Sequence, residues 1–217
     1  MKPLIKICGL STPETVAAAL DNGADMIGFI FFPKSPRHVS VEHAARLRQA
    51  AFGRAIAVAV SVDASDVALD AIVAGMKPDM LQMHGHESPE RVREVKARFA
   101  LPVMKATSVR ERADLDQIAP FMGIADKFLL DAKAPKGSDL PGGNGVSFDW
   151  RLLSALDPGL DYMLSGGLNA GNVAEALLLT HAPGLDVSSG VERAPGIKDI
   201  GMINKFFAAA AAAGVMV

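Results

Sequence analysis

Two short apolar runs decide the fold of this chain: LIKICGL at residues 4–10 and KFLLD at residues 127–131. The first run holds Cys8, the only cysteine, and the second ends on Asp131. Runs that are apolar almost throughout are typical of parallel strands buried on both faces. The carboxyl ends of parallel barrel strands meet at one rim, so we expect this thiol and this carboxyl to lie across one pocket, where they could shuttle protons.

Similar apolar runs alternate with helical patterns along the whole chain. The expected strands are 4–8, 26–31, 56–62, 80–83, 103–106, 127–131, 162–165 and 185–188, and the expected helices are 13–22, 41–51, 65–74, 89–97, 111–121, 148–156, 170–179 and 200–213. Eight strand–helix units predict an α/β chain that forms a single (β/α)8 TIM barrel, with one domain over residues 1–217. A doubly wound open sheet is the alternative, because periodicity does not reveal closure.

Composition narrows the class of function. The formal net charge is −2, which argues against a broad surface for nucleic acid or an anionic membrane. A single cysteine cannot form an internal disulfide, which fits a reducing compartment. The sequence begins without a secretory pattern and contains no uninterrupted apolar run of membrane-spanning length, so we expect a cytoplasmic location.

Three glycine-rich segments indicate a phosphorylated substrate. They are GGNG at 142–145, SGGLN at 165–169 and SSGVE at 188–192. The last two follow the seventh and eighth expected strands, where barrels frequently bind phosphate through backbone N–H groups. The first lies in the longest expected loop, at 132–145. The spacing of a P-loop and a G-x-G-x-x-G fingerprint after the first strand are both missing from the sequence, so nucleotide binding is not indicated.

The two candidate proton-transfer groups each have a structural alternative. A lone cysteine such as Cys8 is more often a small buried hydrophobe than a catalyst, although its position at a strand end favours the rim. Lys6 is two residues before Cys8 and is expected on the same face of the strand. Asp131 could be a cap or a loop anchor, or a general acid whose pKa is raised by partial burial.

Arg37 and a histidine pair are the remaining polar candidates. Arg37 follows Pro33 and Pro36, which stiffen its loop, so its guanidinium could bind a carboxylate bidentately; the alternative is a solvated loop charge. His84 and His86 form an H-x-H pair, but no suitable carboxylate or cysteine set accompanies it in the sequence, so we expect no metal site.

These motifs, in this order, closely resemble the phosphoribosylanthranilate isomerase family over nearly the whole chain. The resemblance is carried by IKICGL at 5–10, GADMIGF at 23–29, SPR at 35–37, LQMHG at 81–85, LD at 130–131, GGNG at 142–145 with FDW at 148–150, SGGLN at 165–169 and DVSSGVE at 186–192.

The resemblance implies an Amadori isomerase of tryptophan biosynthesis. It implies that Asp131 is the general acid, that Cys8 is the general base, and that Arg37 holds the anthranilate carboxylate while Asp186 lies near the anthranilate moiety. The phosphate would be held around Gly143, Asn144, Gly145, Gly166, Gly167, Ser189 and Gly190. The implied partner is a small phosphorylated substrate, without nucleic acid, membrane, metal or redox cofactor, and no oligomeric state is predicted.

The chain departs from the family pattern at several positions, including the run 58–63, which is less typical around Ser61. Asn144 stands where threonine is frequent, Ser165 where alanine is common, Ala170 where proline is common, and Met83 where leucine is usual. None of these changes removes an expected catalytic group, so we expect them to affect affinity more than activity, with Asn144 and Ser165 altering the phosphate contacts.

Two other functions compete with this interpretation. One is a related barrel isomerase of histidine biosynthesis, but such barrels commonly have an aspartate where this chain has Cys8. The other is a catalytically silent phosphate-binding barrel, against which the joint presence of Cys8, Asp131 and Arg37 argues.

Overall fold

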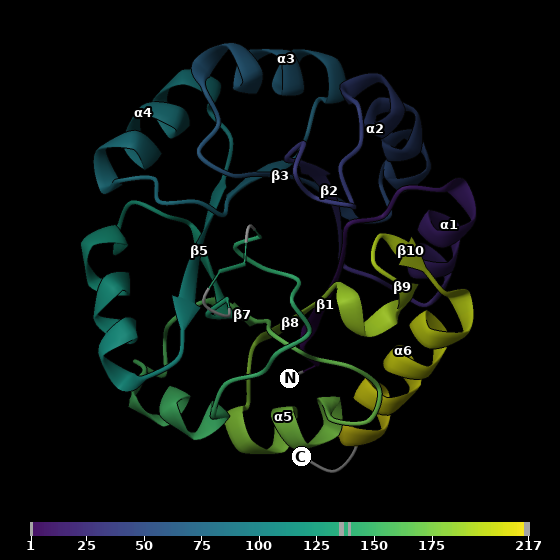
Figure 1. Cartoon of the computed structure of the whole chain (residues 1–217), viewed down its shortest axis with the longest axis vertical. Helices are drawn as coiled ribbons and strands as arrows, with labels where there is room; N and C mark the ends of the chain where they lie inside the picture. Colours follow the sequence, from purple (N-terminus) through teal and green to yellow (C-terminus); the bar gives the residue numbers. More distant parts are fainter. Residues whose placement is uncertain (1, 135–136, 139, 215–217) are drawn as a thin grey trace.

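Eight parallel strands close into one barrel in sequence order (Figure 1). The structure, a computed structural model, describes residues 2–134, 137–138 and 140–214. The strands are β1 Leu4–Cys8, β2 Met26–Phe31, β3 Ile56–Ser61, β4 Met80–Met83, β5 Val103–Val109, β6 Lys127–Ala132, β7 Tyr162–Leu164 and β8 Gly184–Val187. Because β8 pairs with β1, the predicted (β/α)8 TIM barrel is confirmed and the open sheet is excluded.

Helical segments form a ring around the barrel (Figure 1). They are α1 Pro13–Asp21, α2 Val41–Arg48, η1 Gln49–Ala51, α3 Asp66–Met76, α4 Pro89–Phe99, η2 Arg112–Phe121, η3 Trp150–Ala155, α5 Val173–Thr180 and α6 Ile200–Gly214. The short η4 Ser189–Val191 follows β8 and lies inside this ring. The first four α-helices are each capped by a side-chain hydroxyl, which accepts a hydrogen bond from the backbone N–H three residues later and so satisfies an otherwise unpaired donor. The capping residues are Thr12, Ser40, Ser65 and Ser88.

Two of the expected helices are 3-10 segments instead. The expected helix 111–121 is η2, and the expected helix 148–156 shortens to η3. Pro120 lies inside η2 and has no backbone N–H to donate, which disfavours a regular α-helical end. The six residues of η3 are too few to offset the cost of nucleating an α-helix.

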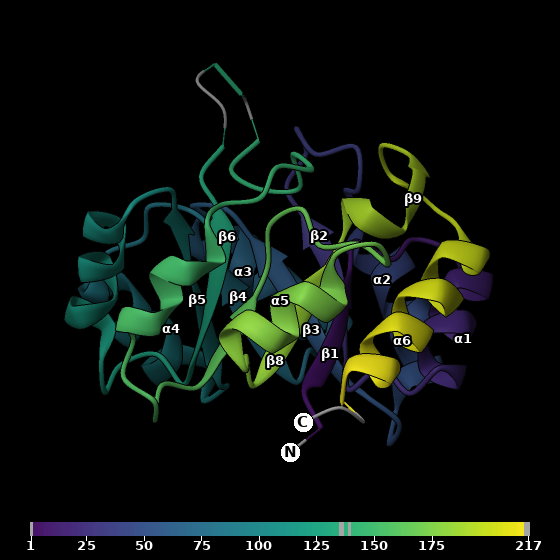
Figure 2. The ribbon, with the colours of Figure 1, turned by 90° about the horizontal axis from the view of Figure 1, so that it is seen from below.

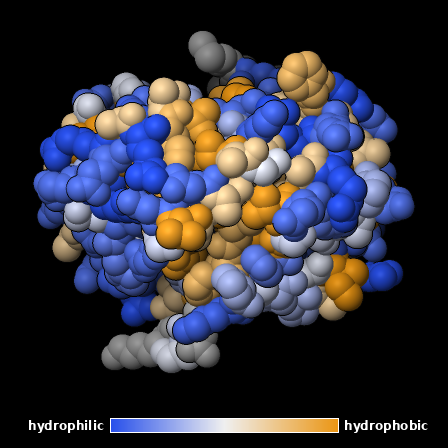
Figure 3. All heavy atoms as spheres, turned by 90° about the horizontal axis from the view of Figure 1, so that it is seen from above, coloured by the Kyte–Doolittle hydropathy of each residue, from blue (hydrophilic) through white to orange (hydrophobic). Residues whose placement is uncertain are grey.

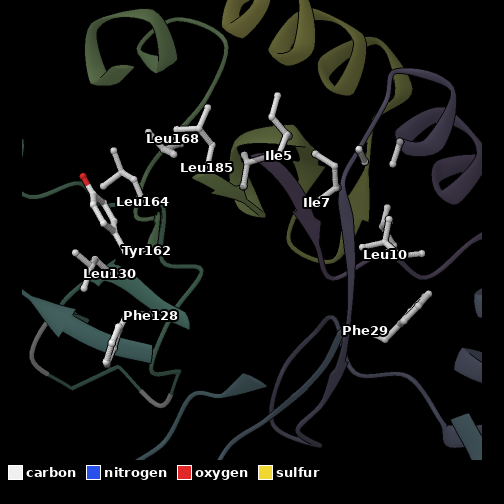
Figure 4. Close-up of a cluster of buried hydrophobic side chains, with 14 of the residues drawn as sticks. Ile5, Ile7, Leu10, Phe29, Phe128, Leu130, Tyr162, Leu164, Leu168 and Leu185 are labelled. Carbon is white, nitrogen blue, oxygen red and sulfur yellow. The ribbon is translucent and has the colours of Figure 1, made fainter. Parts of the chain in front are cut away.

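The core has an inner and an outer part. Side chains that alternate along the strands fill the barrel interior, among them Met26, Met104, Leu129 and Met163. The outer part lies between the strands and the helices and includes Ile7, Leu10, Phe29, Leu164 and Leu185 (Figure 4). Burial on both faces explains why the strands are apolar almost throughout.

The loops at the carboxyl ends of the strands share one end of the barrel. The long connection after β6 rises there, and so does the antiparallel hairpin of β9 Glu192–Ala194 and β10 Ile197–Lys198 (Figure 2). Part of the loop predicted at 132–145 lies outside the described residues, namely 135, 136 and 139.

The side of the barrel that carries the helices at the top of Figure 1 is shown in Figure 3. Hydrophilic residues cover most of this face, with a band of hydrophobic residues between them. Among the helices of the described ranges, none combines the length and the apolar character needed to cross a membrane.

The outer core gives a prediction for stability. Phe29 has no exposed surface, so Phe29→Ala should lower the free energy of unfolding by about 3–5 kcal/mol through lost burial and an unfilled cavity. Phe52 is 77% exposed, and Phe52→Ala should cost about 1 kcal/mol or less. Urea unfolding of both variants checks this, and equal losses would contradict the packing described here.

Candidate active site

One cavity at the carboxyl-terminal rim collects most of the candidate residues. Cys8 ends β1, Asp131 lies near the end of β6, and Asp186 lies near the end of β8. All three line this cavity together with Arg37, Ser165, Ser189 and the segments Leu140–Val146 and Gly166–Leu168. The parallel topology therefore brings together residues that are far apart in the sequence.

Cys8 is 5% exposed. Burial raises the pKa of its thiol, because a thiolate is costly to desolvate, and the Asp186 carboxylate acts in the same direction. The ammonium groups of Lys6 and Lys198 oppose this rise by favouring the thiolate. Gly28 on β2 leaves room for the thiol, since a Cβ there would lie 3.1 Å from Cys8 Sγ and 3.2 Å from Lys6 Cε.

Lys6 and Asp186 form an ion pair beneath the thiol. The β1–β8 register sets these residues opposite each other, and Lys6 Nζ lies 2.7 Å from Asp186 Oδ1 with both side chains almost fully buried. Burial disfavours the ammonium, but Asp186 and Cys8 outweigh it and raise the pKa of Lys6, so this lysine stays charged. Asp186 Oδ2 also accepts a hydrogen bond from Ser165 Oγ at 3.3 Å.

Asp131 faces His84, one of the two histidines of the H-x-H pair. Asp131 is 4% exposed, and its Oδ1 accepts the N–H of Ala132 at 2.9 Å. His84 Nε2 lies 3.4 Å from Asp131 Oδ2. Gln82 Nε2 lies 2.9 Å from His84 Nδ1, so the imidazole lies between the Gln82 amide and the Asp131 carboxyl.

His84 and His86 do not act as a pair. His86 is exposed and lies next to Asp63, with 3.5 Å between Nδ1 and Oδ2, whereas His84 points toward Asp131. Over residues 2–134, 137–138 and 140–214, no group of three or more His, Cys, Asp or Glu side chains is arranged to hold a metal ion.

Arg37 is buried and engaged on two sides. Its Nε and Nη2 donate to Glu192 Oε1 and Oε2, each at 2.8 Å, and Nη2 also donates to the carbonyl of Gly143 at 3.3 Å. Gly9, at φ +78°, lets the arginine pass, because a Cβ there would lie 2.8 Å from Arg37 Cδ. Arg37 is therefore not a solvated loop charge, which was the alternative interpretation of its position in the sequence.

Glu192 and Lys198 form a buried charged group with Arg37 that the sequence pattern did not reveal. They lie on the β9–β10 hairpin, and Lys198 Nζ donates to Glu192 Oε1 at 2.7 Å. Burial raises the pKa of Glu192, but Arg37 and Lys198 outweigh it and keep the carboxylate ionised. Burial lowers the pKa of Lys198 to about 8 against the opposing influence of Glu192 and Cys8. The turn residues Pro195-Gly196 are the signal that could have revealed this hairpin.

The glycine-rich segments pack against each other around the cavity. A Cβ on Gly166 would lie 2.6 Å from the Ala132 nitrogen. Gly143, Asn144, Gly145, Gly166, Gly167 and Ser189 line the cavity. Gly190 is instead pressed against the carbonyl oxygen of Leu168, 1.8 Å from where a Cβ would stand, so it brings the last two loops together.

The side chains at two of the departures from the family pattern are already engaged. Asn144 Nδ2 donates to the carbonyl of Leu140 at 3.1 Å, and Asn144 Oδ1 accepts from Ser138 Oγ at 2.9 Å. Ser165 is bonded to Asp186, as described above. Both side chains are therefore hydrogen-bonded to other protein groups.

The chain is similar in sequence and fold to isomerases. A family model for N-(5'-phosphoribosyl)anthranilate isomerase matches residues 5–209. The N-(5'-phosphoribosyl)anthranilate isomerase of Brucella canis is 70% identical over 207 residues, which cover 95% of this chain and 93% of the relative.

Two crystal structures extend the similarity to the fold. Phosphoribosyl anthranilate isomerase of Thermotoga maritima superimposes with a TM-score of 0.87 at 32% identity, covering 97% of this chain and 99% of the other. A phosphoribosyl anthranilate isomerase in complex with reduced 1-(o-carboxyphenylamino)-1-deoxyribulose 5-phosphate superimposes with a TM-score of 0.84 at 30% identity, with the same coverage of 97% and 99%.

The environment of Cys8 gives a pH prediction that needs no substrate. Because burial raises the pKa of the thiol, the rate of Cys8 alkylation by iodoacetamide should keep rising at pH values where the same thiol in the unfolded chain has reached its plateau. Lys6→Met should move the native profile further toward high pH, since it removes a cation that favours the thiolate. Mass spectrometry reads the label on the only cysteine. A native profile that levels off at lower pH than the unfolded one would contradict this prediction.

Proposed function

The chain belongs to the N-(5'-phosphoribosyl)anthranilate isomerase family, and from that premise we propose that Cys8 is the general base and Asp131 the general acid of its reaction. The enzyme converts N-(5'-phosphoribosyl)anthranilate to 1-(2-carboxyphenylamino)-1-deoxyribulose 5-phosphate, an Amadori rearrangement in tryptophan biosynthesis. The observation that supports the roles best is that a buried thiol and a buried carboxyl line one cavity together with Arg37.

The reaction moves protons and needs no external oxidant or reductant. Asp131 protonates the ribose ring oxygen, and the bond from C1 to that oxygen breaks to give an open-chain protonated Schiff base. The Cys8 thiolate removes the proton from C2, whose electron pair forms the C1–C2 double bond while the imine pair returns to nitrogen. The resulting enolamine tautomerises, with C2 losing its hydroxyl proton and C1 gaining one. C2 is thereby oxidised to a ketone and C1 is reduced.

The two groups need opposite protonation states in one site. The Schiff base acidifies the C2–H bond, so a thiolate of modest basicity suffices. The Lys6 ammonium lowers the pKa of the thiol and so partly offsets the larger effect of burial, while its pairing with Asp186 keeps the lysine charged. Asp131 lies under the loop residue Gly142, where a Cβ would come within 2.4 Å of Oδ2, so its carboxyl is covered by backbone.

The two anionic ends of the substrate orient it across the cavity. The phosphate binds at the backbone around Gly143–Gly145, Gly166–Gly167 and Ser189–Gly190, and the anthranilate carboxylate binds to Arg37, with Asp186 near the anthranilate moiety. The isomerase crystallised with reduced 1-(o-carboxyphenylamino)-1-deoxyribulose 5-phosphate holds a ligand with both a phosphate and a carboxylate, which supports a site for two anionic groups. A cytoplasmic location is part of the same proposal, because the reaction belongs to amino-acid biosynthesis.

The proposed activity is tested with freshly generated N-(5'-phosphoribosyl)anthranilate, whose anthranilate-type fluorescence is lost on isomerisation. Loss of fluorescence with the purified chain supports the reaction. A folded chain that produces no change would favour the silent phosphate-binding barrel instead.

The proposed roles predict the behaviour of two variants. Cys8→Ala and Asp131→Asn should each lower kcat by about two to four orders of magnitude, which is the usual contribution of a general acid or base. Circular dichroism and urea unfolding serve as controls that each variant is folded. Normal turnover in either variant would remove that residue from the mechanism.

A further inference from the structure

The β9–β10 hairpin has no role in the steps described so far, yet it is built around Arg37. Its turn packs against the loop that carries the arginine: a Cβ on Gly196 would lie 2.4 Å from the carbonyl oxygen of Pro36. Its two charged ends, Glu192 and Lys198, point inward with side chains 3% and 1% exposed. A surface hairpin that buries two charges beside a third indicates a role beyond packing.

Glu192 fixes the orientation of the Arg37 guanidinium. Both carboxylate oxygens are used at 2.8 Å, a bidentate geometry that leaves the guanidinium plane little freedom to rotate. Nη2 is shared with the carbonyl of Gly143. Nη1 has no hydrogen-bond partner among the described residues, and a Cβ on Gly143 would lie only 2.6 Å from it. The glycine therefore keeps one donor of Arg37 clear at the cavity.

The charges around Glu192 do not cancel. One carboxylate is shared by two cations, Arg37 and Lys198, so one positive charge is left in a buried cluster beside the cavity. A buried unpaired charge is costly, and a substrate carboxylate at Arg37 would offset it. Glu192 therefore holds the arginine in place without neutralising its attraction for an anion.

Lys198 extends the same cluster to the loop after β8. Its Nζ donates to the carbonyl of Ser188 at 2.9 Å and to Ser188 Oγ at 3.2 Å. Ser188 directly precedes Ser189 and Gly190, the residues proposed to meet the phosphate. The hairpin thus connects the proposed carboxylate end of the site with its phosphate end through two side chains.

We propose that Glu192 is a positioning residue for substrate recognition: it holds Arg37 so that the free donor of the guanidinium binds the anthranilate carboxylate. This inference rests on the role proposed above for Arg37. Glu192 itself does not touch the substrate, so its contribution should vanish whenever either the carboxylate or Arg37 is removed.

Two ligands separate this role from a general structural one. Binding is measured calorimetrically with reduced 1-(o-carboxyphenylamino)-1-deoxyribulose 5-phosphate and with its phenylamino counterpart, which lacks the carboxylate. Glu192→Gln should lower the affinity for the carboxylated ligand by about 10- to 100-fold, because glutamine can keep at most one of the two hydrogen bonds to Arg37. The same variant should leave the affinity for the phenylamino ligand unchanged.

A double-mutant cycle tests whether Glu192 acts through Arg37. Arg37→Ala should lower the affinity for the carboxylated ligand, and adding Glu192→Gln should lower it no further, because the effects of coupled residues are not additive. In turnover, Glu192→Gln should raise KM for the substrate more than it lowers kcat. Glu192→Asp keeps the charge on a shorter side chain and should cause a smaller loss of affinity, confined to the carboxylated ligand. This variant provides the test if the glutamine variant does not fold.

Glu175→Gln is the matched control, since it makes the same chemical change on the exposed face of α5. Equal losses for both ligands, or additive effects in the cycle, would overturn the role of Glu192 while Arg37 keeps its own. An Arg37→Ala variant that does not distinguish the two ligands would overturn the carboxylate role of Arg37, and with it the positioning role of Glu192.

Discussion

Closure of the barrel between β1 and β8 is the constraint on which the site depends. It sets Lys6 opposite Asp186, and the two side chains meet as a buried ion pair with 2.7 Å between Nζ and Oδ1. Neither charge would be tolerable there alone. Because alternate residues of a strand share a face, the same register points Cys8 inward, two residues after Lys6, so the pair that closes the barrel also sets the environment of the thiol.

The buried charges balance below the thiol but leave a positive excess beside the cavity. Lys6 and Asp186 balance each other below the thiol, whereas Arg37 and Lys198 share only Glu192. The surplus positive charge lies beside the cavity, where the anions of the substrate are proposed to bind. A barrel with a small net negative charge can therefore attract a substrate with two anionic groups through a local field.

The strands and the order of the elements followed from the sequence because parallel barrel strands are buried on both faces and leave a plain apolar signal. Cys8 and Asp131 could be singled out because each carries a proton-transfer group at or next to the end of such a run. The helices at η2 and η3 were predicted from polarity patterns that a 3-10 segment can also satisfy.

The partners of the polar residues were harder to predict. Arg37 and Glu192 are 155 positions apart, and their contact depends on a short hairpin that periodicity does not reveal. His84 could not be assigned to Asp131 either, because the contact depends on the order β4-β5-β6 in the sheet, which the sequence does not reveal. Long-range pairing of charged side chains is set by tertiary structure, which local patterns do not encode.

The central claim is that the thiol and the carboxyl act on the two reacting positions of one bound sugar. A crystal structure of this chain with reduced 1-(o-carboxyphenylamino)-1-deoxyribulose 5-phosphate tests it most directly. The account predicts Cys8 Sγ in contact with C2, the Asp131 carboxyl within hydrogen-bond distance of the oxygen on C4, and the carboxylate on Arg37. A ligand bound in the cavity with C2 out of reach of Cys8, or with its carboxylate away from Arg37, would contradict it.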